Sequence, residues 1–369
     1  MTQRAFRIAY LINSLEGGGA QSPLPAILSS LERAGAKVRL FALARKDGKA
    51  IAALEDAGIE PLIYDGALRN HPGALAWTMR HLTRFQPDAI WTSLTRATLI
   101  GQIVGARLGV PVASWQHSAF LKPWNERLLR WRRSASNIWI ADSEAVAELT
   151  RKRLRLEAGK VTTWPIFFAD PGAAQASPWQ QGEPVRIGTI GRLHVSKGFD
   201  TLLEAAALLE QRTDIPPFSI EIGGDGADRA MLEGKAAAIG LSSVGFAGFV
   251  EKPARFLARL HLYVQPSRRE GFCIAMHEAM QAGLPVVVSR VGEMPHTVTV
   301  PAMGRIVEPD DAIALAAGLA EMLDLRHDFA ELGKAARGRV LELFPRSDFD
   351  AKAAELVNFL KQAADFAQD

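Results

Sequence analysis

The sequence predicts two α/β domains, each a doubly wound parallel sheet of the Rossmann type. The chain has 369 residues, and a single hydrophobic core stops growing at ~250–300 residues. In both halves, short β-branched runs alternate with helix-like segments, which is the pattern of a parallel sheet. Between the two halves, a stretch rich in Pro, Gly, Ala and Gln interrupts the alternation. We therefore place a linker at 171–184, between domains at 1–170 and 185–349.

Strands and helices alternate through the first domain. The expected strands cover residues 6–12, 38–43, 59–64, 89–92, 112–115, 138–141 and 160–164. The expected helices cover residues 51–57, 75–85, 99–108 and 144–155, with one more around Ile27, Leu28 and Leu31. Either Asp142 or Ser143 is expected to cap the helix at 144–155.

The second domain repeats the pattern. The expected strands cover residues 186–190, 218–222, 244–250 (with its loop), 262–264, 286–288 and 304–307. The expected helices cover residues 199–210, 231–239, 274–281, 312–323 and 329–344. A final amphipathic helix is expected over 350–369.

Composition favours a soluble globular protein of the cytoplasm. Hydrophobic residues make up 48% and charged residues 22%, which is ordinary for such proteins. Cys273 is the one cysteine, so no intrachain disulfide is possible and a reducing compartment is expected. We see no signal-peptide core and no apolar run of about 18 residues that could span a membrane.

The net charge of +3 hides an uneven distribution. Residues 1–170 hold 23 Lys and Arg against 14 Asp and Glu, a net charge of +9, and the remainder carries −6. A basic half suits an anionic partner such as a lipid surface. The sequence has no nucleic-acid-binding motif, so nucleic acid is not an expected partner.

The stretch from Leu262 to Ser289 reads as strand, loop, helix and strand. Glu270 lies in the loop, at the carboxyl end of the first strand, where ligands of parallel sheets bind. Glu278 follows about two turns into the helix. Carboxylates bind hydroxyl groups, and the free N–H groups of a helix N-terminus bind phosphate. The combination favours a sugar nucleotide, although two surface glutamates in an ordinary βαβ unit would give the same spacing.

A second loop, Gly191–Gly198, carries two cations before the helix at 199–210. Arg192 can bind a diphosphate with two hydrogen bonds, and Lys197 adds a compact positive charge. The alternative is a surface loop with two basic residues.

Two features of the first domain are weaker signals. A glycine run, Gly17 to Gly19, follows the first strand and lacks the last glycine of a dinucleotide fingerprint. His117 follows the strand at 112–115, a position where both structural and functional histidines occur.

Taken together, the motifs resemble those of the retaining glycosyltransferases of family 4, which have the GT-B fold. Their signature is close to P-S-x-x-E-G-F-G-[LI]-x-x-x-E-A-M-A-x-G-x-P-V-V. The matching residues are Pro266, Ser267, Glu270, Gly271, Phe272, Ile274, Glu278, Ala279, Met280, Gly283, Pro285, Val286 and Val287. Cys273 departs from it, at a position where glycine is commonest. The family's G-R-L-x-x-x-K-G motif is matched from Gly191 to Gly198.

The resemblance implies two Rossmann-like domains that face a central cleft, with the final helix packed back on the N-terminal domain. It implies transfer of a sugar from a UDP- or GDP-sugar to an acceptor hydroxyl, by same-face attack, without a metal or other cofactor. The catalytic residues it implies are His117, Arg192, Lys197 and Glu270. The donor-binding residues it implies are Gly18, Gly19, Arg192, Lys197, Phe249, Val250, Glu270, Gly271, Phe272, Cys273, Ile274 and Glu278.

The resemblance further implies that His117 and Glu270 face the donor sugar and that Glu278 binds the ribose. Phe249 and Val250 lie near the base or, alternatively, are plain core residues. Cys273 adds a side chain beside the sugar pocket.

Two other functions stay open. One is another GT-B activity, either a sugar-nucleotide epimerase or a phosphorylase, although a pyridoxal-phosphate phosphorylase would be longer and would need a Schiff-base lysine. The other is a non-catalytic protein that binds a sugar nucleotide.

The segment Trp124–Arg133 suggests where the acceptor lies. As a helix it aligns Trp124, Leu128 and Trp131 in an apolar stripe. The arginines around this stripe are Arg127, Arg130, Arg132 and Arg133. Tryptophan and arginine suit the lipid headgroup layer. We therefore expect a lipid-linked or saccharide acceptor at the inner face of the cell membrane, unless the two tryptophans are core residues.

Overall fold

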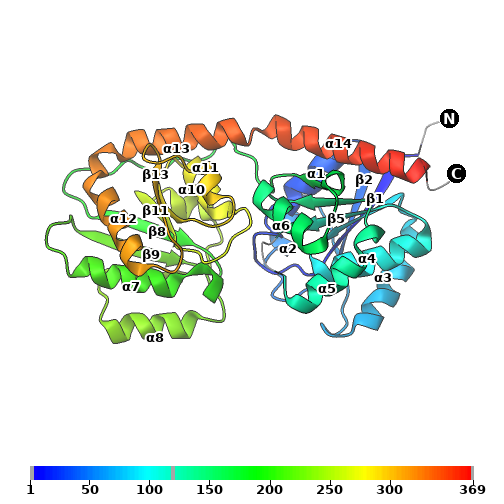
Figure 1. The fold of residues 1–369 in the computed structure, drawn as a ribbon, viewed down its shortest axis with the longest axis horizontal. Helices are drawn as coiled ribbons and strands as arrows, with labels where there is room; N and C mark the ends of the chain where they lie inside the picture. The colour runs from blue at the N-terminus through cyan, green and yellow to red at the C-terminus, as the bar shows by residue number, and fades with distance from the viewer. Residues whose placement is uncertain (1–3, 118–120, 367–369) are drawn as a thin grey trace. The chain divides into compact units, whose positions relative to one another are not determined.

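The computed structural model describes residues 4–117 and 121–366, which form two compact units (Figure 1). Unit 1 extends to Ile166 and resumes at Arg346, and unit 2 is Phe167–Pro345. Each unit is an α/β domain built on one parallel sheet. The predicted fold class is confirmed. The last three residues of the predicted helix at 350–369 lie outside the described residues.

The sheet of unit 1 has the strand order β3-β2-β1-β4-β5-β6-β7. The strands are β1 Phe6–Ile12, β2 Ala36–Ala42, β3 Leu62–Ile63, β4 Ala89–Ser93, β5 Val112–Gln116, β6 Ile138–Ala141 and β7 Val161–Thr163. The helices are α1 Leu24–Arg33, α2 Ile51–Asp56, α3 His71–Phe85, α4 Thr95–Leu108, α5 Pro123–Trp131, α6 Glu144–Leu154 and α14 Arg346–Asp365. The strand order reverses beside β1, so β1 and β4 are neighbours, and ligands bind at the carboxyl ends of strands near such a point.

Local chemistry explains where several of these elements depart from the prediction. The strand expected at 59–64 is reduced to Leu62–Ile63, because Gly58 has a φ of 73° and Pro61 has no N–H to give a neighbour. Helix α3 begins four residues earlier than expected, because the side chain of Asn70 accepts a hydrogen bond from Gly73 N.

The sheet of unit 2 has the order β10-β9-β8-β11-β12-β13. Its strands are β8 Val185–Ile190, β9 Phe218–Gly223, β10 Val244–Gly248, β11 Leu262–Gln265, β12 Val286–Ser289 and β13 Gly304–Val307. Its helices are α7 Phe199–Glu210, α8 Arg229–Ile239, α9 Pro253–Leu257, α10 Ile274–Gln281, α11 Met294–Thr297, α12 Ala312–Asp324 and α13 Phe329–Leu343. The short α9 and α11 were not predicted. They have five and four residues, too few to show a helical period.

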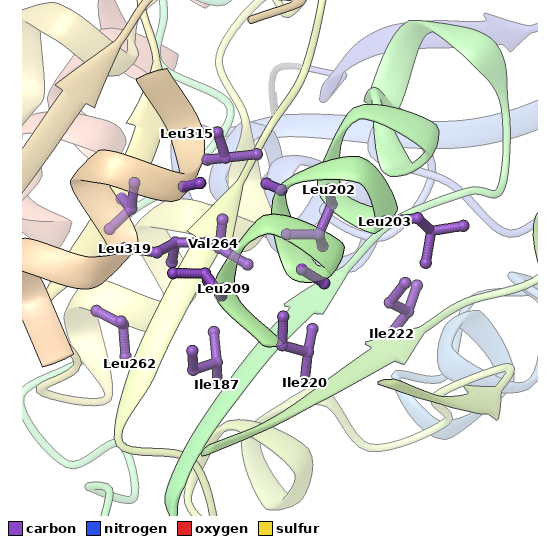
Figure 2. Packing of buried hydrophobic residues seen from close by; sticks show 14 of the residues in the cluster. Ile187, Leu202, Leu203, Leu209, Ile220, Ile222, Leu262, Val264, Leu315 and Leu319 are labelled. Atoms are coloured by element: carbon purple, nitrogen blue, oxygen red, sulfur yellow. The ribbon is translucent and has the colours of Figure 1, made fainter. Parts of the chain in front are cut away.

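The core of unit 2 lies between its sheet and the pair α7 and α12 (Figure 2). Leu202 and Leu209 of α7 and Leu319 of α12 pack over Ile187 of β8 and Val264 of β11, and all five are buried. This core fixes the carboxyl ends of β8 and β11. The two loops that carry Lys197 and Glu270 begin there.

The division between the two units falls after Ile166, four residues before the predicted end of the first domain. Phe167 packs against Phe272, His277 and Phe344, with ring centroids 5.6–6.2 Å apart. Residues 167–170 therefore belong to unit 2. The expected linker at 171–184 also belongs to unit 2: Ala176 N donates to Ala282 O at 2.7 Å, and Trp179 packs against the core. The composition of this stretch does not indicate such packing, because a single residue, Trp179, attaches an otherwise polar segment to the core.

Helix α14 belongs to unit 1, where the prediction placed the final helix. Asp350 of α14 accepts hydrogen bonds from Ser30 and Arg33 of α1. Phe349 packs on Trp164, with ring centroids 5.0 Å apart.

Candidate functional site

An ion pair joins the two loops of unit 2 that the motifs singled out. Lys197 Nζ donates to Glu270 Oε1 at 2.5 Å, and the two side chains are 22% and 10% exposed. Burial by itself would lower the pKa of Lys197, but the carboxylate of Glu270 offsets this, so its pKa is raised. The ammonium therefore stays charged at neutral pH. Arg192 lies on the surface of the same loop, and its charge acts on Lys197 as a nearby cation.

Polar side chains of the β11 loop hold the Glu270 carboxylate in place. Ser267 Oγ donates to Glu270 Oε1 at 2.7 Å, and Gln265 Nε2 donates to the same oxygen at 3.4 Å. Gln265 is itself held by the hydroxyl of Tyr263 at 2.7 Å. Since these contacts and the lysine all meet Oε1, the carboxylate has a fixed orientation.

Close backbone packing shapes the loop that carries Arg192 and Lys197. Gly198 has a φ of 65°, and a Cβ there would lie 2.0 Å from Pro266 O. Gly224, at the end of β9, would place a Cβ 1.8 Å from Gly191 O. Only glycine fits either position, and their closeness lets the loops after β8, β9 and β11 meet.

Arg268 fastens the two loops from the other side. Its guanidinium donates to both carboxylate oxygens of Asp200, at 2.7 and 2.8 Å, and to Val195 O at 2.9 Å. Asp200 lies in the first turn of α7, so the loop after β11 is tied to the loop after β8. This role was not predicted, because no spacing rule links Arg268 to Asp200.

Cys273 lies in the left-handed region, with φ and ψ both 67°, and directly precedes α10. This backbone conformation favours glycine, which explains why glycine is commonest at this position of the resembled motif. The thiol is buried, and burial together with the charge of Glu270 raises its pKa. The thiol is therefore neutral, and its predicted place beside the sugar pocket stays a prediction.

The side chain of Phe272 packs in the core, so only its backbone can meet a ligand. Its ring stacks on His277 with centroids 4.0 Å apart. His277, which no motif singled out, bonds Cys273 O through Nδ1 at 2.9 Å and Thr297 Oγ1 through Nε2 at 3.0 Å. Burial lowers the pKa of His277 to about 3, so the ring is neutral.

Glu278 lies on α10, four residues after Ile274, the first residue of the helix, and so about one turn into it and not the predicted two. Burial raises its pKa to about 7. A carboxyl group with this pKa changes charge close to neutral pH. Ile274, also predicted to bind the donor, is the first residue of α10 and is half-buried.

The two residues predicted beside the base differ in exposure. Phe249 is 46% exposed. Val250 is half-buried, and its side chain closes over Gly223 at the end of β9. Core packing therefore accounts for Val250 but not for Phe249.

His117 of unit 1 is part of a buried polar row. Its Nδ1 lies 2.9 Å from Asp142 Oδ1, and its Nε2 lies 3.0 Å from Ser93 Oγ. Ser93 Oγ is in turn 2.7 Å from the hydroxyl of Tyr10. These residues stand at neighbouring strands in the order β1, β4, β5 and β6. Both ring nitrogens of His117 are thus bonded within unit 1.

The capping prediction is resolved by this row. Ser143 caps α6, since its side chain accepts from Val146 N at 3.2 Å. Asp142 instead accepts hydrogen bonds from His117 and from Trp115 Nε1. Neither Tyr10 nor Ser93 was predicted to lie in the site. The one sequence feature that marks them is a polar side chain within or at the end of a buried strand.

A tryptophan cluster supports the row from below. Trp115 stacks on Trp164 at 4.8 Å and packs edge-on against Trp91 at 5.8 Å. All three are fully buried, and the ring of His117 lies over Trp115 at 5.2 Å.

The glycine run lies between β1 and α1. Gly18 O accepts hydrogen bonds from Gln21 N and Ser22 N, at 3.1 and 3.0 Å. Gly18 is half-buried and Gly19 is exposed. The loop is a tight turn, and a ligand for it stays a prediction.

Helix α5 exposes its tryptophans. Leu129 is fully buried, whereas Trp124 is 67% and Trp131 is 75% exposed. The alternative that both are core residues is therefore wrong. Of the four arginines, Arg127 and Arg133 are exposed, and Arg130 is bonded to Glu126 and to Arg153 O. Arg132 lies against the ring of Trp131, at 5.9 Å.

Two features are absent from the residues that the structure describes. In residues 4–117 and 121–366 no group of three or more His, Cys, Asp or Glu side chains is arranged to hold a metal ion. Over the same ranges, no helix has both the length and the apolar character needed to cross a bilayer.

Two family models match the two halves of the chain. The family described as "Glycosyltransferase Family 4" matches residues 17–167. The family described as "Glycosyl transferases group 1" matches residues 173–339.

Curated relatives are similar over parts of the chain. An MMP alpha-(1->4)-mannosyltransferase of Mycolicibacterium hassiacum is 30% identical over 45% of this chain and 40% of its own length. The lipopolysaccharide core biosynthesis mannosyltransferase LpcC of Rhizobium leguminosarum is 28% identical over 69% of this chain and 66% of its own. The chain spans less than half the length of the first relatives that it matches.

Solved structures share the fold over nearly the whole chain. Anabaena HepE, in complex with UDP and glucose, is 22% identical with a TM-score of 0.83, over 96% of this chain and 99% of its own. Sucrose-phosphate synthase from Thermosynechococcus elongatus is 21% identical with a TM-score of 0.80, over 97% and 100%.

Proposed function

The chain belongs to the group 1, family 4 glycosyltransferases, and on that premise we propose that it is a retaining enzyme using a nucleoside-diphosphate sugar. The single observation that carries this is the Lys197–Glu270 pair, which sets a half-buried cation and an oriented carboxylate side by side. The cation suits the diphosphate and the carboxylate suits a sugar hydroxyl. In this proposal Arg192 and Lys197 stabilise the negative charge that develops on the leaving nucleotide.

The acceptor hydroxyl attacks from the face that the nucleotide leaves, and the departing phosphate takes its proton. In this scheme no protein nucleophile is needed. The rigid position of Glu270 fits a residue that aligns the sugar, because Ser267, Gln265 and Lys197 fix its carboxylate from one side.

The donor is proposed to be a UDP- or GDP-sugar. HepE, which has the same fold, binds UDP and glucose, and this supports a UDP-sugar donor. Two relatives are mannosyltransferases, and they support a mannosyl donor equally well. A panel of nucleotide sugars in a thermal-shift assay tests this. A true donor at a hundredfold excess over its Kd should stabilise the protein by ~2.7 kcal/mol.

The panel, followed by an acceptor screen, separates the proposed enzyme from its two rivals. Transfer to an acceptor, with release of the nucleoside diphosphate, supports the proposal. Tight binding without transfer or hydrolysis indicates a sugar-nucleotide-binding protein. Conversion of the donor sugar without an acceptor indicates an epimerase.

Transfer is expected to persist when divalent metals are removed. In our proposal Arg192 and Lys197 supply the positive charge at the diphosphate, so the reaction needs no bound Mg²⁺ or Mn²⁺. Initial rates with excess EDTA should stay within about twofold of the untreated rate. If EDTA abolishes turnover and added Mg²⁺ or Mn²⁺ restores it, the proposal of a metal-independent reaction is rejected.

The acceptor is proposed to be lipid-linked and reached at an anionic membrane face. Helix α5 presents Trp124 and Trp131 to solvent beside the exposed Arg127 and Arg133. Exposed tryptophan is costly unless it is covered, and its ring suits the headgroup layer. Each basic residue near an anionic surface contributes ~1 kcal/mol to binding.

Co-sedimentation with vesicles checks the membrane proposal. The wild-type protein should pellet with vesicles that contain anionic lipid, and less so at high salt. The double variant Arg127→Gln/Arg133→Gln and the double variant Trp124→Ala/Trp131→Ala should both stay in the supernatant.

A matched control removes the same charge from unit 2. Lys252 and Arg255 are exposed there, so Lys252→Gln/Arg255→Gln should pellet like the wild type. Wild-type protein that remains soluble with anionic vesicles at low salt would favour a soluble saccharide acceptor.

A further inference from the structure

The polar row of unit 1 determines which ring nitrogen of His117 carries the hydrogen. An ionised Asp142 only accepts hydrogen bonds, and its Oδ1 already accepts from Trp115 Nε1 at 2.6 Å. The contact of 2.9 Å between His117 Nδ1 and the same oxygen therefore needs a hydrogen on Nδ1. In the neutral ring, Nε2 then has a lone pair.

The other half of the row fits this assignment. Ser93 Oγ–H donates to the Nε2 lone pair at 3.0 Å, and the hydroxyl of Tyr10 donates to Ser93 Oγ at 2.7 Å. Burial raises the pKa of Tyr10, so its hydroxyl keeps the proton. Each hydrogen in the row has one acceptor, and the ring has a single orientation over Trp115.

The geometry also resembles a Ser-His-Asp triad, but it cannot work as a nucleophilic one. Ser93 is fully buried at the end of β4, and the side chain of His117 is only 5% exposed. A nucleophilic serine must be reached by a substrate carbonyl. The row therefore orients His117 and does not activate Ser93.

We propose that Asp142 is a positioning residue that sets the Nδ1–H tautomer of His117 and holds its ring over Trp115. This rests on the proposed function, with His117 as one of the catalytic residues that the family resemblance implies. The ring is nearly buried and bonded at both nitrogens, so a change of tautomer would disturb the whole row.

The tautomer can be read by NMR of protein labelled with ¹⁵N in its histidine rings. The spectrum is recorded above pH 8, where an ordinary histidine with a pKa of ~6.5 is neutral. The His117 signal is assigned by its loss in His117→Gln. It should show a protonated Nδ1 and a bare Nε2 in the wild type, a result that depends on no variant's folding.

Asp142→Asn is expected to weaken the preference for the Nδ1–H tautomer. The amide oxygen keeps the bond from Trp115 Nε1, so the amide NH₂ takes the place of Oδ2, 3.2 Å from Nδ1, and opposes a hydrogen on that nitrogen. We expect kcat to fall about 10- to 100-fold, the range seen when a group that orients a functional side chain is lost, with the donor KM within about threefold of wild type.

Ser143→Ala is the matched control, because Ser143 is adjacent in sequence but only caps α6. It should lower stability while leaving the tautomer and kcat as in the wild type. A wild-type His117 with its hydrogen on Nε2 would overturn the assignment. A shifted tautomer equilibrium in Asp142→Asn with wild-type kcat would overturn the positioning role. Absence of transfer by the wild type on every donor would instead reject the proposed function, while the tautomer result stands.

Discussion

Lys197→Ala is expected to weaken binding of UDP or GDP by more than tenfold, which corresponds to ~1.4 kcal/mol. The substitution removes the cation that faces the diphosphate. It also leaves Glu270, 10% exposed, as a charge without its ion partner. Breaking a buried pair by removing one partner costs ~3–5 kcal/mol when the pair is deeply buried. Lys197 is 22% exposed, so a smaller loss of stability is expected here.

Further variants separate the two effects, with calorimetry for affinity and thermal unfolding for stability. Lys197→Met keeps the length of the side chain and should lose affinity like alanine. Lys197→Met/Glu270→Gln removes both charges, so it should regain stability but not affinity. Lys235→Ala breaks a more exposed pair with Glu204 in the same unit and should leave the Kd unchanged. An unchanged Kd in Lys197→Ala would reject the assignment of the diphosphate site.

The motifs singled out the proposed members of the unit 2 site because each occurs at a fixed distance from a strand or a helix. They did not predict the contacts between members. Lys197 and Glu270 are 73 residues apart, and only the order of β8 and β11 brings them together. Arg268 and Asp200 meet for the same reason. Contacts of this kind depend on which strands are neighbours, which no local pattern of residues determines.

The environment of a side chain is a second feature that the sequence leaves open. Helical periodicity placed Trp124 and Trp131 on one face of α5, but the direction of that face depends on the neighbouring elements, and Leu129 is the residue that packs inward. Asp142 and Ser143 look alike as caps, yet the side chain of Asp142 points at Trp115 and His117. A sequence gives the position of a polar residue and not its partner.

Glu278→Gln is expected to raise the stability of the ligand-free protein at pH 8 and to weaken its binding of nucleotide. Burial raises the pKa of Glu278 from its usual value of 4.5 to about 7. Below pH 4.5 the group is protonated in both folded and unfolded protein, so its ionisation does not change the free energy of unfolding there. As the pH rises from 4.5 to 7, the unfolded chain ionises first and stability is lost. Above pH 7 the loss is complete.

Glutamine is neutral at every pH and so avoids this loss. The gain at pH 8 should be roughly 1–3 kcal/mol, because each unit of pKa shift corresponds to ~1.4 kcal/mol and partial exposure reduces the effect. It should disappear at pH 4. Thermal unfolding across this pH range measures it. Glu331→Gln, at an exposed position of α13, is the control and should show no such dependence on pH.

The same variant tests the proposed role of Glu278 in holding the ribose. A charged carboxylate accepts hydroxyl hydrogens more strongly than an amide oxygen does, so Glu278→Gln should bind UDP or GDP about tenfold more weakly. Glu270→Ala should instead lose turnover and keep most of its affinity for the free nucleotide, since Glu270 is assigned to the sugar. Equal loss of nucleotide affinity in both variants would sink the division of labour between the two carboxylates. A gain in stability at pH 8 with unchanged affinity would show that burial of Glu278 serves another purpose than the ribose.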